Sequence, residues 1–405
     1  MTMRDILTQP DTIVTESLSP RFPWRAVILI GVGWMVALMV FQQIAWKRFT
    51  LERPDYAYPW TGEMTPGYAA SPDTGPWFYA RWDSPRYVKI ARVGYTEPRL
   101  APHFPLYPVL MRVVYEAVID PLGLGDWDTG RPHAGMALAG LIVSAGMMLL
   151  AILAMAGLAW DWLGPDDTLR AVFYLLIFPT AFYMVQVYSE ATYMAVSLGA
   201  LWFTYRRRWI PAVILIVLAT LTRTMGVLLA IPYLTTWVAE WWEGRRPPRR
   251  ALIGVLLPPL VFAGWALWLD SQGLSMFAAQ EDFGREVLTV RSLLIFFGDV
   301  IYIFRAANGI HVALDLALTL LAVVLCVAEL KRFPGLAMYG VGSVAMGISS
   351  GQLVSMNRYA LAVVPIYFAL TRWGRHPVFD RVWTFISLLW FGLYTVLYVH
   401  GFWVG

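Results

Sequence analysis

The sequence has little charge and almost no cysteine. Charged residues make up 14% of the 405 residues, whereas soluble domains carry roughly one quarter. The single cysteine, Cys326, excludes an intrachain disulfide and a cluster of cysteine ligands around a metal. The net charge of +4 is modest and gives no indication of nucleic-acid binding.

Sequence features of nucleotide and zinc chemistry are also missing. No glycine-rich loop of the kind that cradles a nucleotide phosphate is present, and the five histidines show no metal-binding spacing. No cofactor is therefore expected, and no metal ligand is assigned. The pattern leaves a requirement for a divalent metal open.

Apolar sequence dominates what is present. Hydrophobic residues make up 58% of the chain and the mean hydropathy is +0.56, which is typical of a polytopic membrane protein. A helix needs about 20 apolar residues to cross a bilayer with its backbone hydrogen bonds satisfied. The recurring apolar runs predict an all-α fold with about eleven transmembrane helices. Four regions are expected: a cytoplasmic tail over 1–25, a first transmembrane helix over 26–45, an external loop over 46–132 and a transmembrane helical bundle over 133–405.

Basic residues predict the orientation of these helices. They cluster at every second connector, and the positive-inside rule places such connectors in the cytoplasm. The clusters are Arg206–Arg208, Arg245–Arg250, Lys331–Arg332 and Arg372–Arg381. The N-terminus is then cytoplasmic and loop 46–132 external. A chain rich in Ala, Arg and Trp without long polar insertions indicates a prokaryotic plasma membrane.

The external loop is too long and irregular for a simple connector. A short helix is expected to begin at Asp83 or Ser84, with Pro85 in its first turn, and to stop at Gly94. A second short helix is expected from residue 108 to residue 119, which is too short to span a bilayer. Both helices are expected at the membrane surface.

Asp83 is the central acid of this loop. One interpretation is that its side chain only caps the following helix, since Asp-x-Pro is an ordinary helix start. The other is that it acts as a base, because a helix N-terminus and nearby arginines such as Arg86 favour the ionised form that a base needs at neutral pH. The two roles are compatible.

Glu190 and Arg223 interrupt apolar stretches further along the chain. Glu190 either lies in a solvated turn or needs a partner, because an acid in the apolar layer costs roughly 2.5 kcal/mol or more. Arg223 either extends toward the interface or binds an anion, and its planar guanidinium suits a phosphate.

Two further polar sites fall on the same predicted side. Arg358, next to Asn357, anchors a helix end or joins Arg223 as a second phosphate contact. His103 is either a hydrogen-bonded structural residue or part of the site. The predicted topology thus brings Asp83, Glu190, Arg223 and Arg358 to the external face, where they could share one cavity.

These residues carry a family resemblance. Four segments resemble, in order, the GPI mannosyltransferase II family and its prokaryotic relatives, over most of residues 77–370. The segments are Trp82-Asp83 with Tyr87 and Gly94-Tyr95 followed by Phe104-Pro-Leu-Tyr-Pro108, then Phe178-Pro-Thr-Ala-Phe182 with Tyr188-Ser-Glu190, then Leu221-Thr-Arg223 ahead of Gly226, and Met356-Asn-Arg-Tyr359. The chain departs from the family at Ser84-Pro85-Arg86 and at His103.

The resemblance implies a GT-C type membrane glycosyltransferase with a large first external loop that carries surface helices. Such an enzyme moves a hexose, mannose by resemblance, from a polyprenyl-phosphate donor to a membrane-embedded or periplasmic acceptor that is a lipid, glycan or protein. Asp83 would then be the catalytic base of an inverting reaction. The donor phosphate would be bound by Arg223, Arg358 and His103. Substrate contacts are expected from Glu190, Arg86, Trp82, Tyr107 and Asn357.

Three other classes of protein can be weighed against this interpretation. A transporter or flippase of a lipid-linked sugar would place its charges near the membrane midplane between repeats, and no internal repeat is evident. A membrane acyltransferase would need a His-x4-Asp motif, but the residue five after His103 is Pro108. A structural scaffold gives no reason for four costly charges on one side.

Overall fold

The computed structural model describes residues 21–50, 75–125, 133–282, 309–349, 356–402 and 404, with residues 294, 297, 298 and 301 between them. The predictions for 1–20, 51–74 and 126–132 lie outside the described residues.

Every regular element in the described ranges is a helix, which confirms the all-α prediction. The long and medium α-helices are α2 (Trp24–Arg48), α6 (Ala134–Trp162), α7 (Pro165–Leu176), α8 (Glu190–Tyr205), α9 (Trp209–Thr220), α10 (Ala230–Trp242), α11 (Ile253–Ser271), α14 (Gly309–Glu329), α15 (Pro334–Ile348) and α18 (Pro377–Val399). Shorter α-helices are α4 (Ser84–Val93), α5 (Leu106–Val114), α12 (Met276–Asp282), α16 (Met356–Leu361) and α17 (Val364–Trp373). Short helical turns cover η2 (Gly75–Tyr79), η3 (Pro98–Leu100), η4 (Tyr115–Ile119), η5 (Ala181–Val185), η6 (Thr224–Leu229) and η7 (Arg249–Leu252).

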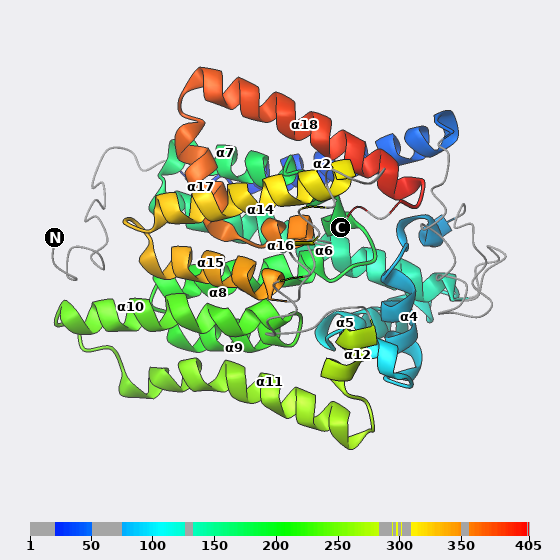
Figure 1. Ribbon diagram of the computed structural model, residues 1–405, viewed down its shortest axis with the longest axis horizontal. Coiled ribbons are helices and arrows are strands. Elements are labelled where there is room, and N and C mark those ends of the chain that lie inside the picture. The colour runs from blue at the N-terminus through cyan, green and yellow to red at the C-terminus, as the bar shows by residue number, and fades with distance from the viewer. Residues whose placement is uncertain are drawn as a thin grey trace.

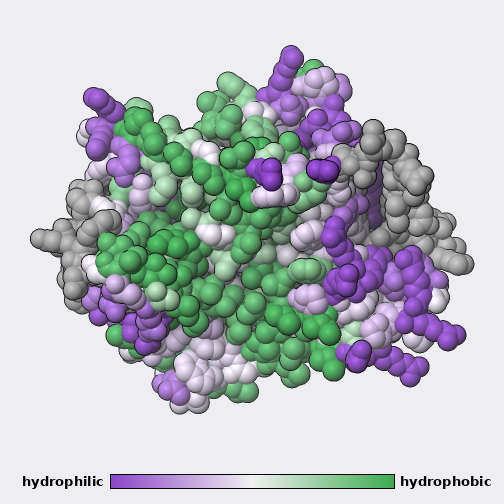
Figure 2. Space-filling model, turned by 180° about the vertical axis from the view of Figure 1, so that it is seen from behind, coloured by the Kyte–Doolittle hydropathy of each residue, from purple (hydrophilic) through white to green (hydrophobic). Residues whose placement is uncertain are grey.

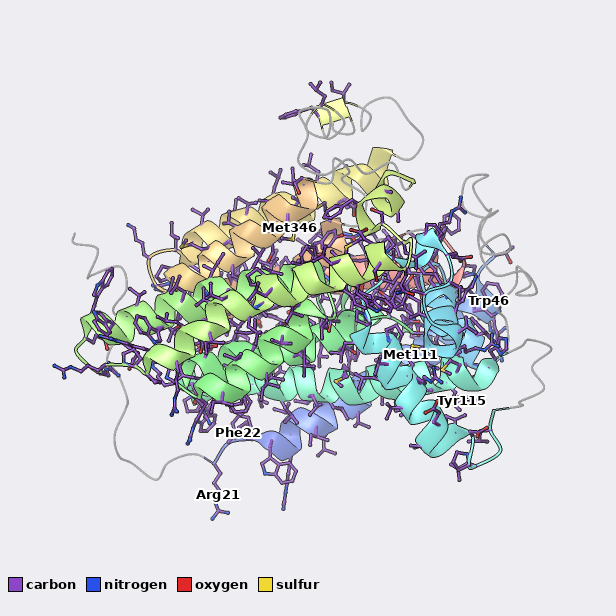
Figure 3. The ribbon with its side chains drawn as sticks, turned by 90° about the horizontal axis from the view of Figure 1, so that it is seen from below. Arg21, Phe22, Trp46, Met111, Tyr115 and Met346 are labelled. Atoms are coloured by element: carbon purple, nitrogen blue, oxygen red, sulfur yellow. The ribbon has the colours of Figure 1, made fainter. Side chains whose placement is uncertain are left out.

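The long helices run roughly parallel in one bundle, and α4, α5 and α12 gather at one end of it (Figure 1). Helix α6 is the centre of the bundle, because it contacts α2, α5, α7 and α8. Trp46, Met111 and Tyr115 lie at the end that carries α4 and α5, whereas Phe22 lies away from it (Figure 3).

Within the part of the chain that the structure describes, four helices are long and apolar enough to cross a membrane: Trp24–Arg48, Ala134–Trp162, Arg249–Ser271 and Pro377–Val399. Apolar side chains cover the middle of the face seen in Figure 2, and hydrophilic side chains gather toward its two ends. Lipid solvates such a belt, whereas water solvates the polar ends. The chain is therefore an integral membrane protein. The count of about eleven spans stays a prediction.

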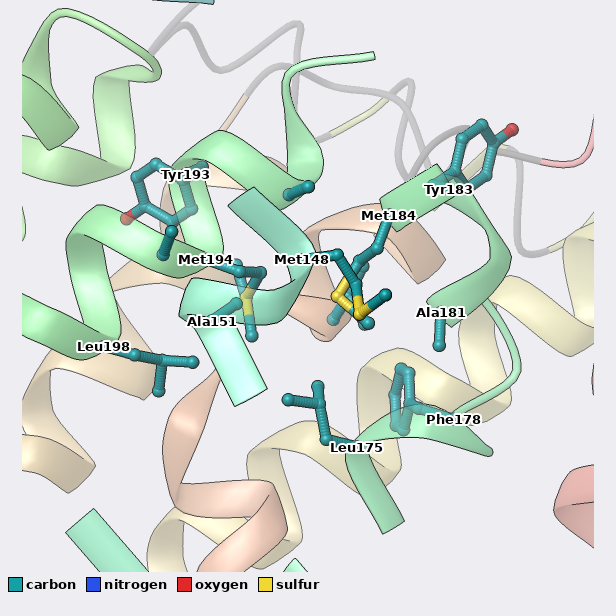
Figure 4. Packing of buried hydrophobic residues seen from close by; sticks show 14 of the residues in the cluster. Met148, Ala151, Leu175, Phe178, Ala181, Tyr183, Met184, Tyr193, Met194 and Leu198 are labelled. Atoms are coloured by element: carbon teal, nitrogen blue, oxygen red, sulfur yellow. The ribbon is translucent and has the colours of Figure 1, made fainter. Parts of the chain in front are cut away.

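Close packing of small and flexible residues holds the centre of the bundle together. Helix α6 is rich in alanine and glycine, which lets neighbouring helices approach closely. The side chains of Met148 on α6 and Met184 on η5 meet beside Leu175 and Phe178 (Figure 4). Methionine fills irregular gaps of this kind because its side chain is unbranched.

Two apolar runs of the sequence are interrupted in the structure. The run over 169–186 is helical only to Leu176, after which the chain turns ahead of Pro179. The run over 357–371 divides into α16 and α17, because Val363 is not helical and Pro365 occupies the first turn of α17. Proline lacks the N–H that a continuous helix needs and disfavours helical geometry in the residue before it.

Both short helices predicted ahead of Gly94 and over 108–119 are present, and their location at the membrane surface stays a prediction. Helix α4 ends at Gly94, whose φ of +79° favours glycine. Helix α5 continues into η4, and Arg112 pairs with Glu116 at 2.8 Å.

A tight turn separates α9 from η6 and carries Arg223. Arg223 itself is extended, with φ −155° and ψ 149°. A Cβ on Gly226 would lie 2.3 Å from the carbonyl carbon of Ala219, so no larger residue fits where the turn crosses the end of α9. The glycine thus lets the chain leave the helix and present an arginine there.

Candidate active site

Four charged side chains meet at the end of the bundle near α4. Asp83 precedes α4, Glu190 begins α8, Arg223 lies between α9 and η6, and Arg358 lies in α16. These positions are far apart in sequence, and two of them fall where the helices are interrupted. The structure therefore brings together the four residues that the predicted topology placed on one side.

Arg358 joins the two acids. Its Nη1 lies 3.1 Å from Oδ2 of Asp83. Its Nε and Nη2 donate to Oε1 of Glu190 at 2.8 and 2.6 Å. One guanidinium thus bridges both carboxylates, a geometry that the planar fork of arginine allows and the single ammonium of lysine does not.

Each acid has a second arginine of its own. Arg86 donates from Nη1 to Oδ1 of Asp83 at 2.6 Å, and Arg223 donates from Nη2 to Oε1 of Glu190 at 2.6 Å. Three arginines and two carboxylates make one continuous cluster, which we call the ion-pair cluster. Its arginines exceed its acids by one, so its net charge is positive.

The two acids differ in accessibility. The Glu190 side chain is 2% exposed, whereas the Asp83 side chain is 16% exposed. Arg223 is also partly open, at 14%. Among the residues that the structure describes, Oε2 of Glu190 has no hydrogen-bond partner although it is buried. Asp83 and Arg223 are thus the members of the cluster that a ligand reaches most directly.

The turn before α4 aims Asp83 into the cluster. The amide of Ser84 donates to the carbonyl of Arg81 at 3.1 Å, which closes the turn, and the Asp83 carbonyl accepts from the amide of Arg86 to start the helix. The Asp83 side chain makes no capping hydrogen bond. Capping by this side chain was one of the two interpretations of Asp83, and it is wrong because its oxygens pair with Arg86 and Arg358 instead.

Tyrosine side chains support the cluster, and the sequence did not single them out. The Arg358 guanidinium lies 4.9 Å from the ring centroids of both Tyr183 and Tyr188, within reach of cation–π attraction. The Tyr188 hydroxyl accepts from the Asp83 amide at 3.2 Å. The sequence pattern Tyr188-Ser-Glu190 contains one of these tyrosines, but only Glu190 was selected from it as a candidate site residue.

Tyr87 on α4 continues this support. Its hydroxyl lies 3.0 Å from Oγ of Ser189, and Nε of Arg223 donates to the same Oγ at 3.5 Å. Burial raises the pKa of Tyr87 to about 12, so the phenol stays neutral. The tyrosine therefore links α4 to Arg223 without adding charge.

The electrostatics keep Asp83 ionised. Burial alone would raise its pKa, but the His103 imidazole and the charges of Arg86 and Arg358 outweigh burial and hold the pKa of Asp83 well below its usual range. Burial lowers the pKa of His103 despite the nearby Asp83, so the imidazole is neutral at pH 7. Nε2 of His103 lies 3.9 Å from Oδ1 of Asp83.

Three other residues that were predicted to contact substrate make hydrogen bonds within the protein. The indole Nε1 of Trp82 donates to the carbonyl of Phe402 at 3.2 Å. The Tyr107 hydroxyl donates to the carbonyl of Gly140 at 3.0 Å. Nδ2 of Asn357 donates to the carbonyl of Val404 at 2.6 Å. All three side chains are buried, so their role in binding substrate stays a prediction without a contact that supports it.

Asp315 is a buried acid that the sequence pattern did not single out. It lies inside α14 and interacts with Asn357 and Tyr394. Acids within membrane helices are rare and usually have partners. Over the described ranges, no three His, Cys, Asp or Glu side chains are grouped to hold a metal ion.

We predict that Glu190→Gln lowers the stability of the protein more than a substitution that removes an exposed acid. Its Oε1 accepts from two arginines, and loss of the charge leaves both guanidinium groups with less compensation in a buried setting. The expected loss is about 3–5 kcal/mol, seen as a lower melting temperature in detergent. Glu116→Gln is the control, because its pair with Arg112 is exposed and contributes at most about 1 kcal/mol. Equal melting temperatures for the two variants would contradict the assignment.

Comparison with known proteins finds a family match over part of the chain. Residues 75–242 match the family model described as Mannosyltransferase (PIG-V). The chain is also similar to the crystal structure of ArnT from Cupriavidus metallidurans bound to undecaprenyl phosphate, with 14% identity and a TM-score of 0.48 over 91% of this chain and 70% of that chain. No curated protein matches the chain. The resemblance found in the sequence is thus confirmed over residues 75–242, which carry the pattern of the mannosyltransferase (PIG-V) family.

Proposed function

We propose that the protein is an inverting glycosyltransferase of GT-C type. It transfers a hexose, mannose by family, from a polyprenyl-phosphate donor to an acceptor at the external face of a prokaryotic plasma membrane. The family match supports a membrane glycosyltransferase. The observation that carries the finer proposal is the ion-pair cluster, in which Arg358 touches both Asp83 and Glu190.

The excess positive charge of the cluster suits an anionic leaving group. Arginine holds a phosphate through two parallel hydrogen bonds, and such charge-assisted bonds are about twice as strong as neutral ones. Arg223 and Arg358 are assigned to the donor phosphate, with the neutral His103 nearby as a further contact. Because they are held in place before the reaction, they stabilise the negative charge that grows on the phosphate as the glycosidic bond breaks.

Asp83 is assigned as the general base. It accepts the proton of an acceptor hydroxyl while that oxygen attacks the anomeric carbon from the side opposite the phosphate. Its lowered pKa keeps it ionised at neutral pH but makes it a weak base. A phosphate that binds Arg358 competes with Asp83 for Nη1, and this competition raises the basicity of Asp83 when donor is present.

Glu190 is assigned a positioning role, and one of its two carboxylate oxygens remains available to accept a hydrogen bond from substrate. Its Oε1 fixes Arg223 and Arg358. Its Oε2, buried and without a partner in the described structure, can accept from a sugar or acceptor hydroxyl. Arg86 holds Oδ1 of Asp83, whereas Oδ2 pairs with Arg358 and is the oxygen that a phosphate competing for Arg358 would free for the reacting hydroxyl.

We predict that Asp83→Asn lowers transfer from a polyprenyl-phosphate sugar by about 10²–10⁴-fold, since the amide cannot accept the proton. Donor binding is expected to stay within a few-fold, because the arginines remain. Asp120→Asn is the matched control, as it removes an exposed acid from the same external loop. Full activity of Asp83→Asn would contradict the assignment of Asp83 as the general base.

A second prediction concerns the side of the membrane. In a chain with Cys326→Ala, a cysteine introduced by Arg92→Cys on α4 is expected to react with an impermeant maleimide on intact cells. One introduced by Arg208→Cys between α8 and α9 is expected to react only after permeabilisation. Both positions are exposed, so accessibility reports the side. The opposite labelling pattern would place the site on the cytoplasmic face.

A further inference from the structure

Asp83 and Arg358 pair within the ion-pair cluster. The residue that precedes each of them donates a hydrogen bond to one short segment after α18. Trp82 precedes Asp83 and donates from Nε1 to the carbonyl of Phe402 at 3.2 Å. Asn357 precedes Arg358 and donates from Nδ2 to the carbonyl of Val404 at 2.6 Å. The accepting carbonyls belong to the C-terminal segment, by which we mean residues 400–402 and 404.

Trp82 is held in an unfavourable backbone conformation. Its φ is +59°, in the left-handed region that suits glycine and is uncommon for a bulky residue. It lies second in the turn that the Ser84 amide closes onto the Arg81 carbonyl. Strain of this kind persists only where the surroundings enforce it. The bond to Phe402, together with burial of the ring to 5% exposure, supplies that constraint.

The C-terminal segment is itself fixed in place. Nδ1 of His400 lies 2.8 Å from the carbonyl of Val396, and Nε2 lies 2.9 Å from the carbonyl of Phe49 at the end of α2. The imidazole also packs against Trp46, with ring centroids 5.3 Å apart. Val404 reaches α16, because its carbonyl accepts from Asn357 in that helix. The segment therefore ties the ends of α2 and α18 to the cluster.

We propose that the C-terminal segment is a brace for the active site. Its carbonyls accept hydrogen bonds from the side chains of Trp82 and Asn357. These two bonds fix the distance of 3.1 Å between Oδ2 of Asp83 and Nη1 of Arg358. Trp82 and Asn357 are thus positioning residues, and they act through their neighbours instead of touching substrate. This inference rests on the proposed function, and the brace lies outside residues 75–242 that match the family.

The test uses two ways of breaking the brace and one matched control. Trp82→Phe keeps an aromatic ring but removes the donor, and a chain ending at Gly401 lacks both accepting carbonyls. The control is Trp237→Phe, because Nε1 of Trp237 donates to the carbonyl of Pro248 at the same distance of 3.2 Å, far from the cluster in sequence. Each full-length or shortened protein is purified in detergent and assayed with a polyprenyl-phosphate sugar.

A brace predicts a specific kinetic pattern. Trp82→Phe should lower kcat about tenfold or more with the donor KM within about threefold, since displacement of a catalytic group costs rate more than binding. Trp237→Phe should stay within about twofold. The shortened chain with Trp82→Phe should be no worse than the poorer single variant, because both changes break one unit. Equal rates for the two tryptophan variants, or losses that multiply, would overturn the brace.

A second readout separates this inference from the proposed function. Melting temperatures of Trp82→Phe, Asp83→Asn and the double variant form a cycle that needs no activity. If the brace orients Asp83, the two losses overlap and their sum exceeds the loss in the double variant. Additive losses would refute the brace. Should the wild-type protein transfer no sugar at all, the proposed function fails while this cycle still decides the brace.

Discussion

The structure depends on one constraint: charges removed from water must meet opposite charges. Burial of an ion costs several kcal/mol, and only close, hydrogen-bonded pairing offsets that cost. Arg358 meets the constraint for two acids at once, and Arg86 and Arg223 complete the cluster. Removal of either acid would leave buried guanidinium charge without compensation. The N-terminal ends of α4, α8 and η6 and the short helix α16 are therefore held together by the same few contacts.

This constraint also explains where the helices break. A continuous apolar helix would carry Arg223 past the cluster, whereas the turn after α9 presents it there, and Arg358 reaches the cluster from the short helix α16. The chain leaves α9 at a point where only Gly226 fits, and α16 ends before Pro365. Irregular backbone at membrane depth is tolerated where it is buried in protein. The interruptions at 177–189, 221–229 and 362–363 thus serve to assemble polar groups at one end of the bundle.

The sequence predicted the members of the cluster because a charge in an apolar run stands out. Glu190 and Arg223 were chosen on that ground and Arg358 at the edge of such a run, whereas Asp83 was chosen as the central acid of a polar loop. The helix that stops at Gly94 was predicted from Pro85 and that glycine. The partners were harder to predict, since pairing across more than a hundred residues depends on how the bundle packs. Capping by the Asp83 side chain is a local rule that tertiary ion pairs overrode.

Contacts with backbone carbonyls left no trace in the sequence at all. Nothing in residues 400–404 indicates that Trp82 and Asn357 would find acceptors there, because any residue supplies a carbonyl. Asp315 was hidden for a related reason, as one acid inside a long span is weak evidence without knowledge of its neighbours. Periodicity finds helices, but it does not reveal which polar groups the fold brings together.

The most direct test of the central claim, that the cluster binds the phosphate of a lipid carrier, is a comparison of two lipids. Purified protein is melted in detergent with a polyprenyl phosphate and with the polyprenol of the same length, which lacks only the anion. A ligand that binds the native state raises the melting temperature according to its concentration and Kd. The account predicts stabilisation by the phosphate alone, and its loss in Arg358→Gln. Equal stabilisation by both lipids, or by the phosphate in Arg358→Gln, would contradict it.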